Sequence, residues 1–247
     1  MRGYTGVIHK ISIIVPVYCE ADNLSSLVGR IMDSLAASHL KDNEIEIIVV
    51  DDNSPDGTRE VCQLLASQCP AIKLIIRFDE RGLGTAVKRG IDESSGDILV
   101  VMDADLSHDP AVVPLLVNEI LNNSTDVAVA SRFIDRGQMH SSPFCTLGSK
   151  ALNTFIRVLL QLPVKDVTGG FLALRKDMLK GLDMDSICRG HGDYSFALLY
   201  SGVRQGWKIK EVGFNYQARK NGVSKTKFLG AGFSYGIRAL KLRMGLE

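Results

Sequence analysis

The chain has 247 residues with a formal net charge of +1, and 45% of its residues are hydrophobic and 23% charged. This composition excludes extended disorder, which requires low hydrophobicity together with a high net charge. The small net charge also argues against nucleic acid as a partner, because proteins that bind polyanions over their whole surface carry a large basic excess. The length fits one large α/β domain with a substantial core.

The cysteines and the N-terminus bear on the cellular compartment. The five cysteines, at positions 19, 62, 69, 145 and 188, follow neither a disulfide framework nor the spacing of metal ligands, which is typical of a reducing compartment. The N-terminus has no secretory pattern, and no run reaches the ~18 apolar residues of a membrane-spanning helix. We therefore expect a cytoplasmic protein that meets a membrane-bound substrate peripherally at the cytosolic face, or through a membrane-protein partner.

The first half of the chain alternates short apolar runs with helical patterns. This rhythm predicts a mainly parallel sheet covered by crossover helices. The predicted strands are residues 11–17, 45–50, 72–76, 98–102 and 127–130. An amphipathic helix is predicted between the first two strands, and Asp22 or Asn23 is its expected N-cap.

The second half is less regular. A helix is predicted over residues 146–162, either as an internal packing helix or as a lipid-facing one. Basic residues outnumber acidic ones from Arg219 onward. We expect one domain over residues 1–225, followed by a basic amphipathic C-terminal tail over residues 226–247. This tail is predicted either to lie on anionic lipid or to form a solvated helix face.

Polar residues directly follow several predicted strands, where ligands bind in an open parallel sheet. The most informative segment is Asp103-Ala104-Asp105. Two carboxylates with a small residue between them can share Mg²⁺ or Mn²⁺ with a diphosphate, which converts repulsion into coordination. A simple turn is the alternative explanation of the two aspartates.

These segments together resemble the family 2 inverting glycosyltransferases, especially the dolichyl- and polyprenyl-phosphate mannose synthases. The likeness covers about residues 11–225 and depends on the order and spacing of IVPVYCE (14–20), VDDNSPDGT (50–58), RGLG (81–84), VMDADL (101–106), ASRF (130–133), DVTGGF (166–171) and RKNGVSK (219–225). It implies a GT-A fold with a Rossmann-like sheet. It also implies metal-assisted transfer of mannose from GDP-mannose to dolichyl or polyprenyl phosphate, with inversion.

The resemblance also implies a set of site residues. It implies that the nucleotide-diphosphate sugar contacts Pro16, Tyr18, Glu20, Val50 and Asp52. Substrate binding extends to Asp103, Ala104, Asp105, Arg132, Arg219 and Lys225. Within this set, Asp103 and Asp105 are the expected metal ligands and, with Arg132, the expected catalytic residues. The cations would hold donor or acceptor phosphates. Each residue also has a structural alternative as a packing residue, a cap or a surface cation.

No set of Ser, His and Asp residues suggests a protein nucleophile, and a lipid phosphate needs none, because it is already anionic near neutral pH. His108 and His191 could assist, although packing is the commoner role of a lone histidine. The glycines of the RGLG segment are expected to turn the chain into a helix rather than to cradle phosphate.

Two positions depart from the family pattern. Ser107 stands where the mannose synthases often have glutamine. Cys145 stands where an arginine grips the acceptor phosphate, and Lys150 is a candidate to compensate. Two alternatives therefore stay open. One is a family 2 enzyme that uses a UDP-sugar and another acceptor, and the other is a catalytically silent subunit that binds nucleotide sugars.

Overall fold

The computed structural model describes residues 10–122, 125–140, 142–190, 192–217 and 228–246, with the backbone alone for 228–231. The strands are β1 (Lys10–Val17), β2 (Glu44–Asp51), β3 (Ile72–Ile76), β4 (Ile98–Val101), β5 (Val127–Ser131), β6 (Gln138–Met139), β7 (Leu172–Arg175), β8 (Ile209–Gly213) and β9 (Asn215–Tyr216). The helices are α1 (Ala21–Ala36), α2 (Thr58–Gln68), α3 (Leu83–Glu93), η1 (Pro110–Val112), α4 (Val113–Asn122), α5 (Pro143–Leu160), η2 (Lys176–Leu179), α6 (Met184–Cys188), α7 (Tyr194–Arg204) and α8 (Phe228–Met244).

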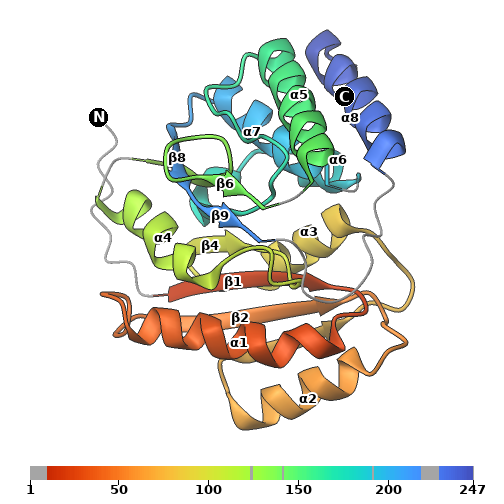
Figure 1. The fold of residues 1–247 in the computed structure, drawn as a ribbon. Coiled ribbons are helices and arrows are strands. Elements are labelled where there is room, and N and C mark those ends of the chain that lie inside the picture. The colour runs from red at the N-terminus through yellow and green to blue at the C-terminus, as the bar shows by residue number, and fades with distance from the viewer. Residues whose placement is uncertain (1–9, 123–124, 141, 191, 218–227, 247) are drawn as a thin grey trace.

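A seven-stranded sheet in the order β3-β2-β1-β4-β7-β5-β8 forms the centre of the molecule (Figure 1). Strands β1 to β4 are parallel, as are β5 and β8, whereas β7 runs antiparallel to both of its neighbours. The five strands expected from the sequence are present within one or two residues of their predicted bounds. The predicted mainly parallel α/β sheet is therefore confirmed.

Helices cover both faces of the sheet because most strands are apolar on both sides. On one face, alternate β1 residues such as Ile11 and Ile13 pack with side chains of α1, α2 and α4. On the other face, Ile14 packs in a second core with side chains of α3 and of α5 to α8. Nearly continuous apolar strands of this kind are typical of parallel sheets that are buried on both faces.

The start of α1 differs from the expectation. Glu20 is the N-cap residue, and neither its own side chain nor that of Asp22 or Asn23 caps the helix, so that expectation is wrong. Instead, the buried Asn23 amide donates a hydrogen bond to the Glu20 carboxylate at 2.8 Å. Asn23 therefore helps to hold the Glu20 side chain in place just beyond the end of β1.

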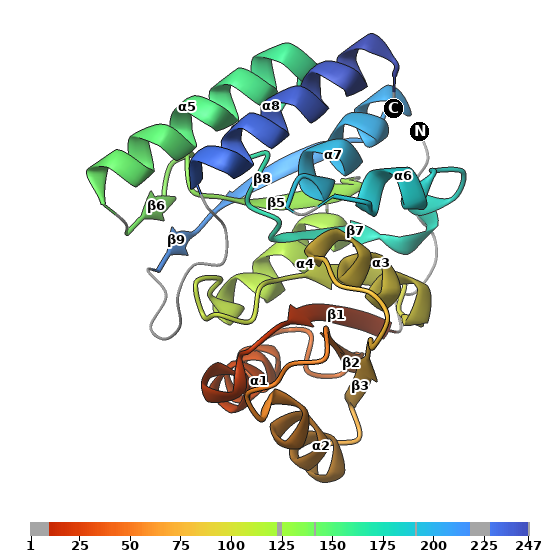
Figure 2. The ribbon, with the colours of Figure 1, turned by 90° about the vertical axis from the view of Figure 1, so that its right-hand side faces the viewer.

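The predicted helix of residues 146–162 is α5, which starts three residues earlier and ends at Leu160. One side of this helix is buried and the other is exposed. Ile156 and Leu160 are buried, whereas Phe144, Leu147 and Val158 are exposed. Figure 2 shows α8 running beside α5 along one side of the molecule. No described helix is both long enough and apolar enough to cross a bilayer.

The RGLG segment leads into α3, as the sequence predicted. A side chain at Gly84 would overlap the backbone carbonyl oxygens of Cys188 and Gly190, and one at Gly90 would overlap the side chain of Ile14. Glycine at these positions lets α3 approach both the sheet and the segment that follows α6. This close approach brings the start of α3 to the ends of β1 and β2.

We expect Gly84→Ala to lower the free energy of unfolding by about 1–3 kcal/mol, because the added methyl group forces a shift of backbone atoms. Gly29→Ala is the matched control, since Gly29 lies within α1 with no atom near the added group. This control should instead stabilise the protein by roughly 0.5–1 kcal/mol. Urea denaturation measures the free energy of unfolding of both variants. Equal increases in the two would contradict the close approach of α3.

Candidate active site

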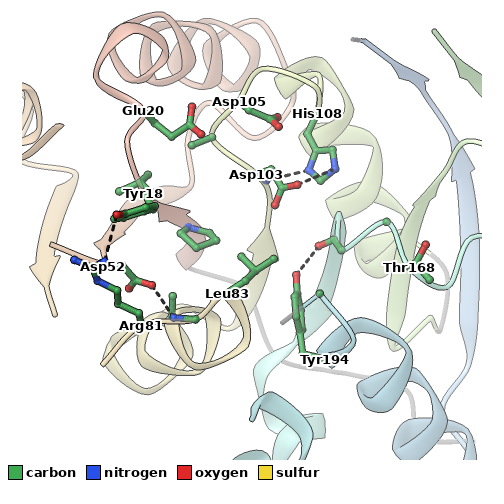
Figure 3. A pocket seen from close by; sticks show the side chains of 18 of the residues that line it. Tyr18, Glu20, Asp52, Arg81, Leu83, Asp103, Asp105, His108, Thr168 and Tyr194 are labelled. Carbon is green, nitrogen blue, oxygen red and sulfur yellow. Dashed lines mark hydrogen bonds and ion pairs between the residues drawn. The ribbon is translucent and has the colours of Figure 1, made fainter. Parts of the chain in front are cut away.

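A cavity of about 520 Å³ lies where the carboxyl ends of β1, β2 and β4 meet. One wall comes from the segments that follow β1 and β2 and from the start of α3, and it includes Tyr18 and Arg81. The opposite wall includes Thr168 and Tyr194. Asp103 and Asp105 lie between these walls, as Figure 3 shows. We call this space the strand-end cavity.

The structure brings together most of the residues expected from the sequence. The cavity is lined by Pro16, Tyr18, Glu20, Asp52, Asp103, Ala104, Asp105 and Arg132. Val50 is fully buried and packs with Ile48 and Ala86 instead, so its side chain does not line the cavity. Arg219, Lys225 and His191 lie outside the described residues.

Hydrogen bonds join the segments that follow β1 and β2. The backbone N–H of Cys19 donates to Ser54 Oγ, and that of Glu20 donates to Thr58 Oγ1, each at 2.9 Å. The Ser54 hydroxyl in turn donates to the buried Asp51 carboxylate at 2.5 Å. The two sequence motifs therefore depend on each other, because the second supplies the hydroxyls that hold the backbone of the first.

Asp52 is held by a partner that the sequence analysis missed. The Arg77 guanidinium donates through Nε to Asp52 Oδ1 at 2.7 Å, and both side chains are nearly buried. The Gly82 backbone N–H donates to Asp52 Oδ2 at 2.8 Å. Arg77 directly follows β3, at the same edge of the sheet as Asp52, and that position is the signal by which the sequence could have revealed it.

Tyr18 and Arg81 form a flat surface on the same wall. The Arg81 guanidinium carbon lies 5.1 Å from the centre of the Tyr18 ring, and Arg81 Nη1 donates to the Tyr18 hydroxyl at 3.3 Å. A guanidinium over an aromatic face is held by the ring quadrupole. This wall therefore offers a planar surface of the kind that can stack against an aromatic base.

The two aspartates between the walls bond to residues of their own loop. The Asp103 backbone N–H donates to His108 Nδ1 at 3.0 Å, and His108 Nε2 lies 3.8 Å from Asp103 Oδ2. The His108 ring also stacks on Phe171. Asp105 Oδ1 accepts hydrogen bonds from the Ser107 backbone amide and hydroxyl. His108 thus orients Asp103, and Ser107 orients Asp105.

This pair of carboxylates fits a divalent cation that arrives with a phosphate ligand. Mg²⁺ is usually held in proteins by one or two carboxylates, with substrate phosphates and water completing its coordination. The described residues contain no group of three or more potential metal ligands. The donor set of Asp103 and Asp105 therefore matches Mg²⁺ or Mn²⁺ shared with a diphosphate, rather than a cation held by the protein alone.

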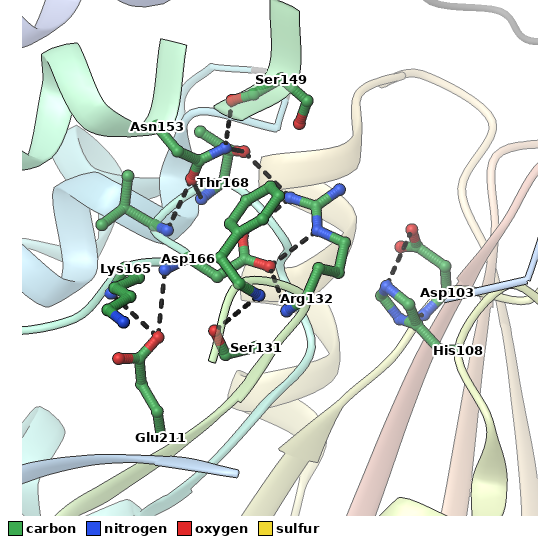
Figure 4. Close-up of polar contacts among 12 residues, drawn as sticks. Asp103, His108, Ser131, Arg132, Ser149, Asn153, Lys165, Asp166, Thr168 and Glu211 are labelled. Atoms are coloured by element: carbon green, nitrogen blue, oxygen red, sulfur yellow. Dashed lines mark hydrogen bonds and ion pairs between the residues drawn. The ribbon is translucent and has the colours of Figure 1, made fainter. Parts of the chain in front are cut away.

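Arg132 belongs to a buried polar network on the opposite wall (Figure 4). Its Nε and Nη2 donate to the two oxygens of Asp166, each at 2.7 Å, and Nη2 also reaches Thr168 Oγ1 at 3.3 Å. Asn153 on α5 donates to the same Thr168 hydroxyl and accepts from the Val167 and Thr168 amides. Burial opposes the charge on Arg132, but the Asp166 carboxylate outweighs this effect and raises the pKa of Arg132.

The opposite wall also contains tyrosines that the sequence analysis missed. Tyr194, Tyr216 and Tyr235 line the cavity, and they come from α7, β9 and α8. Burial, followed by the nearby Asp105 carboxylate, raises the pKa of Tyr216. Scattered tyrosines give no periodic signal, so only the three-dimensional arrangement reveals them.

Of the two departures from the family pattern, Ser107 lies in the aspartate loop, where it bonds to Asp105, and Cys145 lies on α5. Cys145 is in the first turn of α5, where its backbone N–H donates to the N-cap Ser142. Lys150, one and a half turns further along α5, lines a neighbouring cavity of about 510 Å³ together with Arg132. Arg132 therefore borders both cavities, and Lys150 supplies a second cation on the outer side.

We expect Asp166→Ala to lower the free energy of unfolding by about 3–5 kcal/mol, because it leaves the nearly buried Arg132 guanidinium without its carboxylate. Asp177→Ala is the matched control. Its partner Arg175 forms a more exposed pair, which should be worth less than about 1 kcal/mol. Chemical denaturation measures both losses, and a small loss in Asp166→Ala would contradict the described network.

Comparison with known proteins identifies the family. The model of "Glycosyl transferase family 2" matches residues 12–182. A dolichol-phosphate mannosyltransferase of Pyrococcus furiosus is 40% identical over 223 residues, which are 88% of this chain but 59% of the relative's length. A polyprenol monophosphomannose synthase of Mycolicibacterium smegmatis is 32% identical over 218 residues, covering 86% of this chain and 79% of that relative.

A solved structure supports the fold. Glucosyl-3-phosphoglycerate synthase of Mycobacterium tuberculosis, in complex with Mn²⁺, UDP and glucosyl-3-phosphoglycerate, superposes with a TM-score of 0.70. It shares 23% identity, and the match covers 96% of this chain and 80% of that one. The expected GT-A type of fold is therefore confirmed. With a family model that spans more than half of its residues, the chain belongs to glycosyl transferase family 2.

Proposed function

We propose that the chain transfers mannose from GDP-mannose to dolichyl or another polyprenyl phosphate, with inversion and with Mg²⁺ or Mn²⁺ as cofactor. The names of the Pyrococcus and Mycolicibacterium relatives, a dolichol-phosphate mannosyltransferase and a polyprenol monophosphomannose synthase, support mannose as the sugar and a lipid phosphate as the acceptor. The chain spans 59% of the length of the Pyrococcus relative.

The observation that carries the proposal is the charge balance of the strand-end cavity. Among the described residues, its lining includes four carboxylates, Glu20, Asp52, Asp103 and Asp105, and two guanidinium groups, Arg81 and Arg132. A nucleotide diphosphate would be repelled by this excess of negative charge unless a cation came with it. Asp103 and Asp105 would hold that cation, and the bound metal would stabilise negative charge on the departing diphosphate.

The donor nucleotide fits the wall of Tyr18 and Arg81. The base would stack on this planar pair, close to Asp52. Each carboxylate oxygen has two lone pairs, and in the described part of the chain Asp52 Oδ2 accepts one hydrogen bond, from the Gly82 amide. That oxygen can therefore accept an N–H group of guanine. Arg77, which donates to Asp52 Oδ1, would keep the Asp52 carboxylate oriented for this contact.

The opposite wall and the neighbouring cavity suit the acceptor phosphate. Arg132 faces both cavities, and Lys150 adds a positive charge where Cys145 replaces the family arginine. We propose that these cations bind the lipid phosphate, together with Arg219 and Lys225. A phosphate oxygen would then attack the anomeric carbon opposite the leaving diphosphate, and this direct displacement inverts the configuration.

His108 is poorly suited to act as a base in this step. Its Nδ1 already accepts the Asp103 amide, and its ring is buried against Phe171. The acceptor phosphate is ionised near neutral pH and has no proton that must be removed. The chain's residues would therefore act by binding and alignment.

Radiolabelled transfer into lipid, with a panel of nucleotide sugars and a polyprenyl phosphate, tests donor, acceptor and activity together. We expect incorporation from GDP-mannose, with release of GDP. Transfer from UDP-sugars but not from GDP-mannose would refute GDP-mannose as the donor. Tight donor binding without metal-dependent transfer to any phosphate lipid would instead support a binding subunit.

We expect Asp105→Asn to reduce transfer at least about 100-fold, because a neutral amide holds a divalent cation poorly and leaves the diphosphate charge uncompensated. Asp109→Asn is the matched control, since Asp109 follows in the same loop but pairs with Arg30. This control should retain transfer within about twofold, as expected for a partly exposed ion pair. Normal transfer by Asp105→Asn, or by wild-type protein in excess chelator, would contradict the metal role.

A lipid acceptor requires the protein to reach a membrane surface, and α5 and α8 offer an apolar surface for it. On α5 the exposed residues Phe144, Leu147, Phe155 and Val158 recur at helical spacing, and on α8 Phe233, Ile237, Leu240 and Met244 do so. The two helices lie side by side (Figure 2). We propose that this α5–α8 surface docks peripherally on the bilayer, with the tail of residues 226–247 supplying α8.

We expect Leu147→Glu and Leu240→Glu each to reduce flotation with vesicles of phosphatidylcholine and phosphatidylglycerol, because a carboxylate opposes insertion and is repelled by anionic lipid. Leu64→Glu is the matched control, since this exposed leucine lies on α2 at the far side of the molecule. Its flotation should equal that of wild type. Negligible flotation of the wild type, or equal loss in all three variants, would contradict direct docking.

A further inference from the structure

Helix α8 contributes a side chain to the strand-end cavity although it lies at the far end of the chain. Tyr235 lines the cavity beside Gly192 and Tyr194. Its hydroxyl accepts a hydrogen bond from the Gly192 backbone amide, and its ring lies edge-on to Phe196 at 5.8 Å. Burial raises the pKa of Tyr235 to about 12, so the phenol stays neutral at physiological pH.

One buried ion pair fastens this helix to the segment beside the cavity. Arg238 Nη1 donates to Asp193 Oδ2 at 2.7 Å, and the two side chains are 8% and 7% exposed. Arg238 Nη2 donates to the carbonyl oxygens of Ser186 and Ile187, at 2.7 and 2.9 Å. A single guanidinium therefore joins α8, the last turn of α6 and the residue that precedes α7.

The glycines of the same segment make its fit to α8 tight. A side chain at Gly190 would overlap both Asp193 and Arg238, and one at Gly192 would overlap the Tyr235 hydroxyl. The backbone of this segment thus lies directly against α8. The Arg238 contacts therefore hold this segment against the helix that carries Tyr235.

The position of Tyr235 assigns it to the acceptor side. Arg238 donates to Asp193, Ser186 and Ile187, which lie in α6 and just before α7. The wall of Tyr18, Asp52 and Arg81 belongs instead to the segments that follow β1 and β2 and precede α3. Tyr235 lies on the opposite wall. The outer side of α8 bears the exposed apolar residues described above, so the same helix connects the lipid-facing surface with the cavity.

We propose that Tyr235 is an acceptor-binding residue and that Arg238 and Asp193 are positioning residues that hold it and the Gly192 backbone at the acceptor wall. This inference rests on the proposed function. A polyprenyl phosphate that follows α8 into the cavity would meet Tyr235 near its phosphate end, where a neutral hydroxyl can donate to a phosphate oxygen.

The kinetic test compares Arg238→Gln with Arg243→Gln, the same change at an exposed position one to two turns along α8. Arg238→Gln should raise KM for polyprenyl phosphate at least about tenfold, because Tyr235 and the Gly192 backbone are no longer held at the acceptor wall. KM for GDP-mannose should stay within about twofold of wild type. For Arg238→Lys, the acceptor KM should lie between those of wild type and Arg238→Gln, since lysine keeps the positive charge but cannot make the several hydrogen bonds of a guanidinium. Tyr235→Phe should also raise the acceptor KM selectively.

A second measurement is independent of activity. Amide hydrogen exchange of residues 190–194 should accelerate in Arg238→Gln but not in Arg243→Gln, with exchange in β1 and β2 unchanged. Failure of transfer by the wild type would refute the proposed function and leave this exchange result intact. Unchanged exchange in Arg238→Gln, or equal rises of the KM values for acceptor and donor, would overturn the inference.

Discussion

The candidate site depends on one constraint of the backbone, which is that strands of opposite direction bring different ends to the same edge of the sheet. The parallel strands β1, β2 and β4 end there and deliver Tyr18, Asp52 and Asp103. Strand β7 runs antiparallel between β4 and β5, so its beginning lies at that edge. The segment from Asp166 to Gly170 therefore reaches the same cavity and forms its second wall.

Two of the acidic residues at this edge of the sheet belong to buried ion pairs. Asp52 and Asp166 each face a nearly buried guanidinium, that of Arg77 and that of Arg132. Breaking either pair would leave an uncompensated buried charge, so these acids chiefly fix the two walls. The backbone amide of Asp103 bonds to His108, and the carboxylate of Asp105 bonds to Ser107, both in the same loop. Both aspartates line the cavity, where their carboxylates would hold the proposed metal ion.

The sequence predicted the sheet because its strands are apolar runs of ordinary length. The residues that the family resemblance implied for the donor half of the site directly follow these strands, and most of them line the cavity. The sequence analysis missed β7 and β8, which are short or carry charged residues within the strand. It also missed Arg77 and Tyr235, whose roles depend on contacts between segments far apart in the chain. Val50 belongs to a predicted segment, yet its side chain packs in the core, because side chains alternate between the faces of the sheet and only the backbone of a strand end meets a ligand.

The central claim is that Asp103 and Asp105 hold a divalent cation against the donor diphosphate. A crystal structure of the protein grown with Mn²⁺ and GDP, with anomalous data for manganese, tests it most directly. We predict one anomalous peak bonded to oxygen atoms of this aspartate pair and of the diphosphate, at roughly 2.0–2.2 Å. An ordered GDP whose diphosphate lies away from both aspartates, with no manganese between them, would contradict the account.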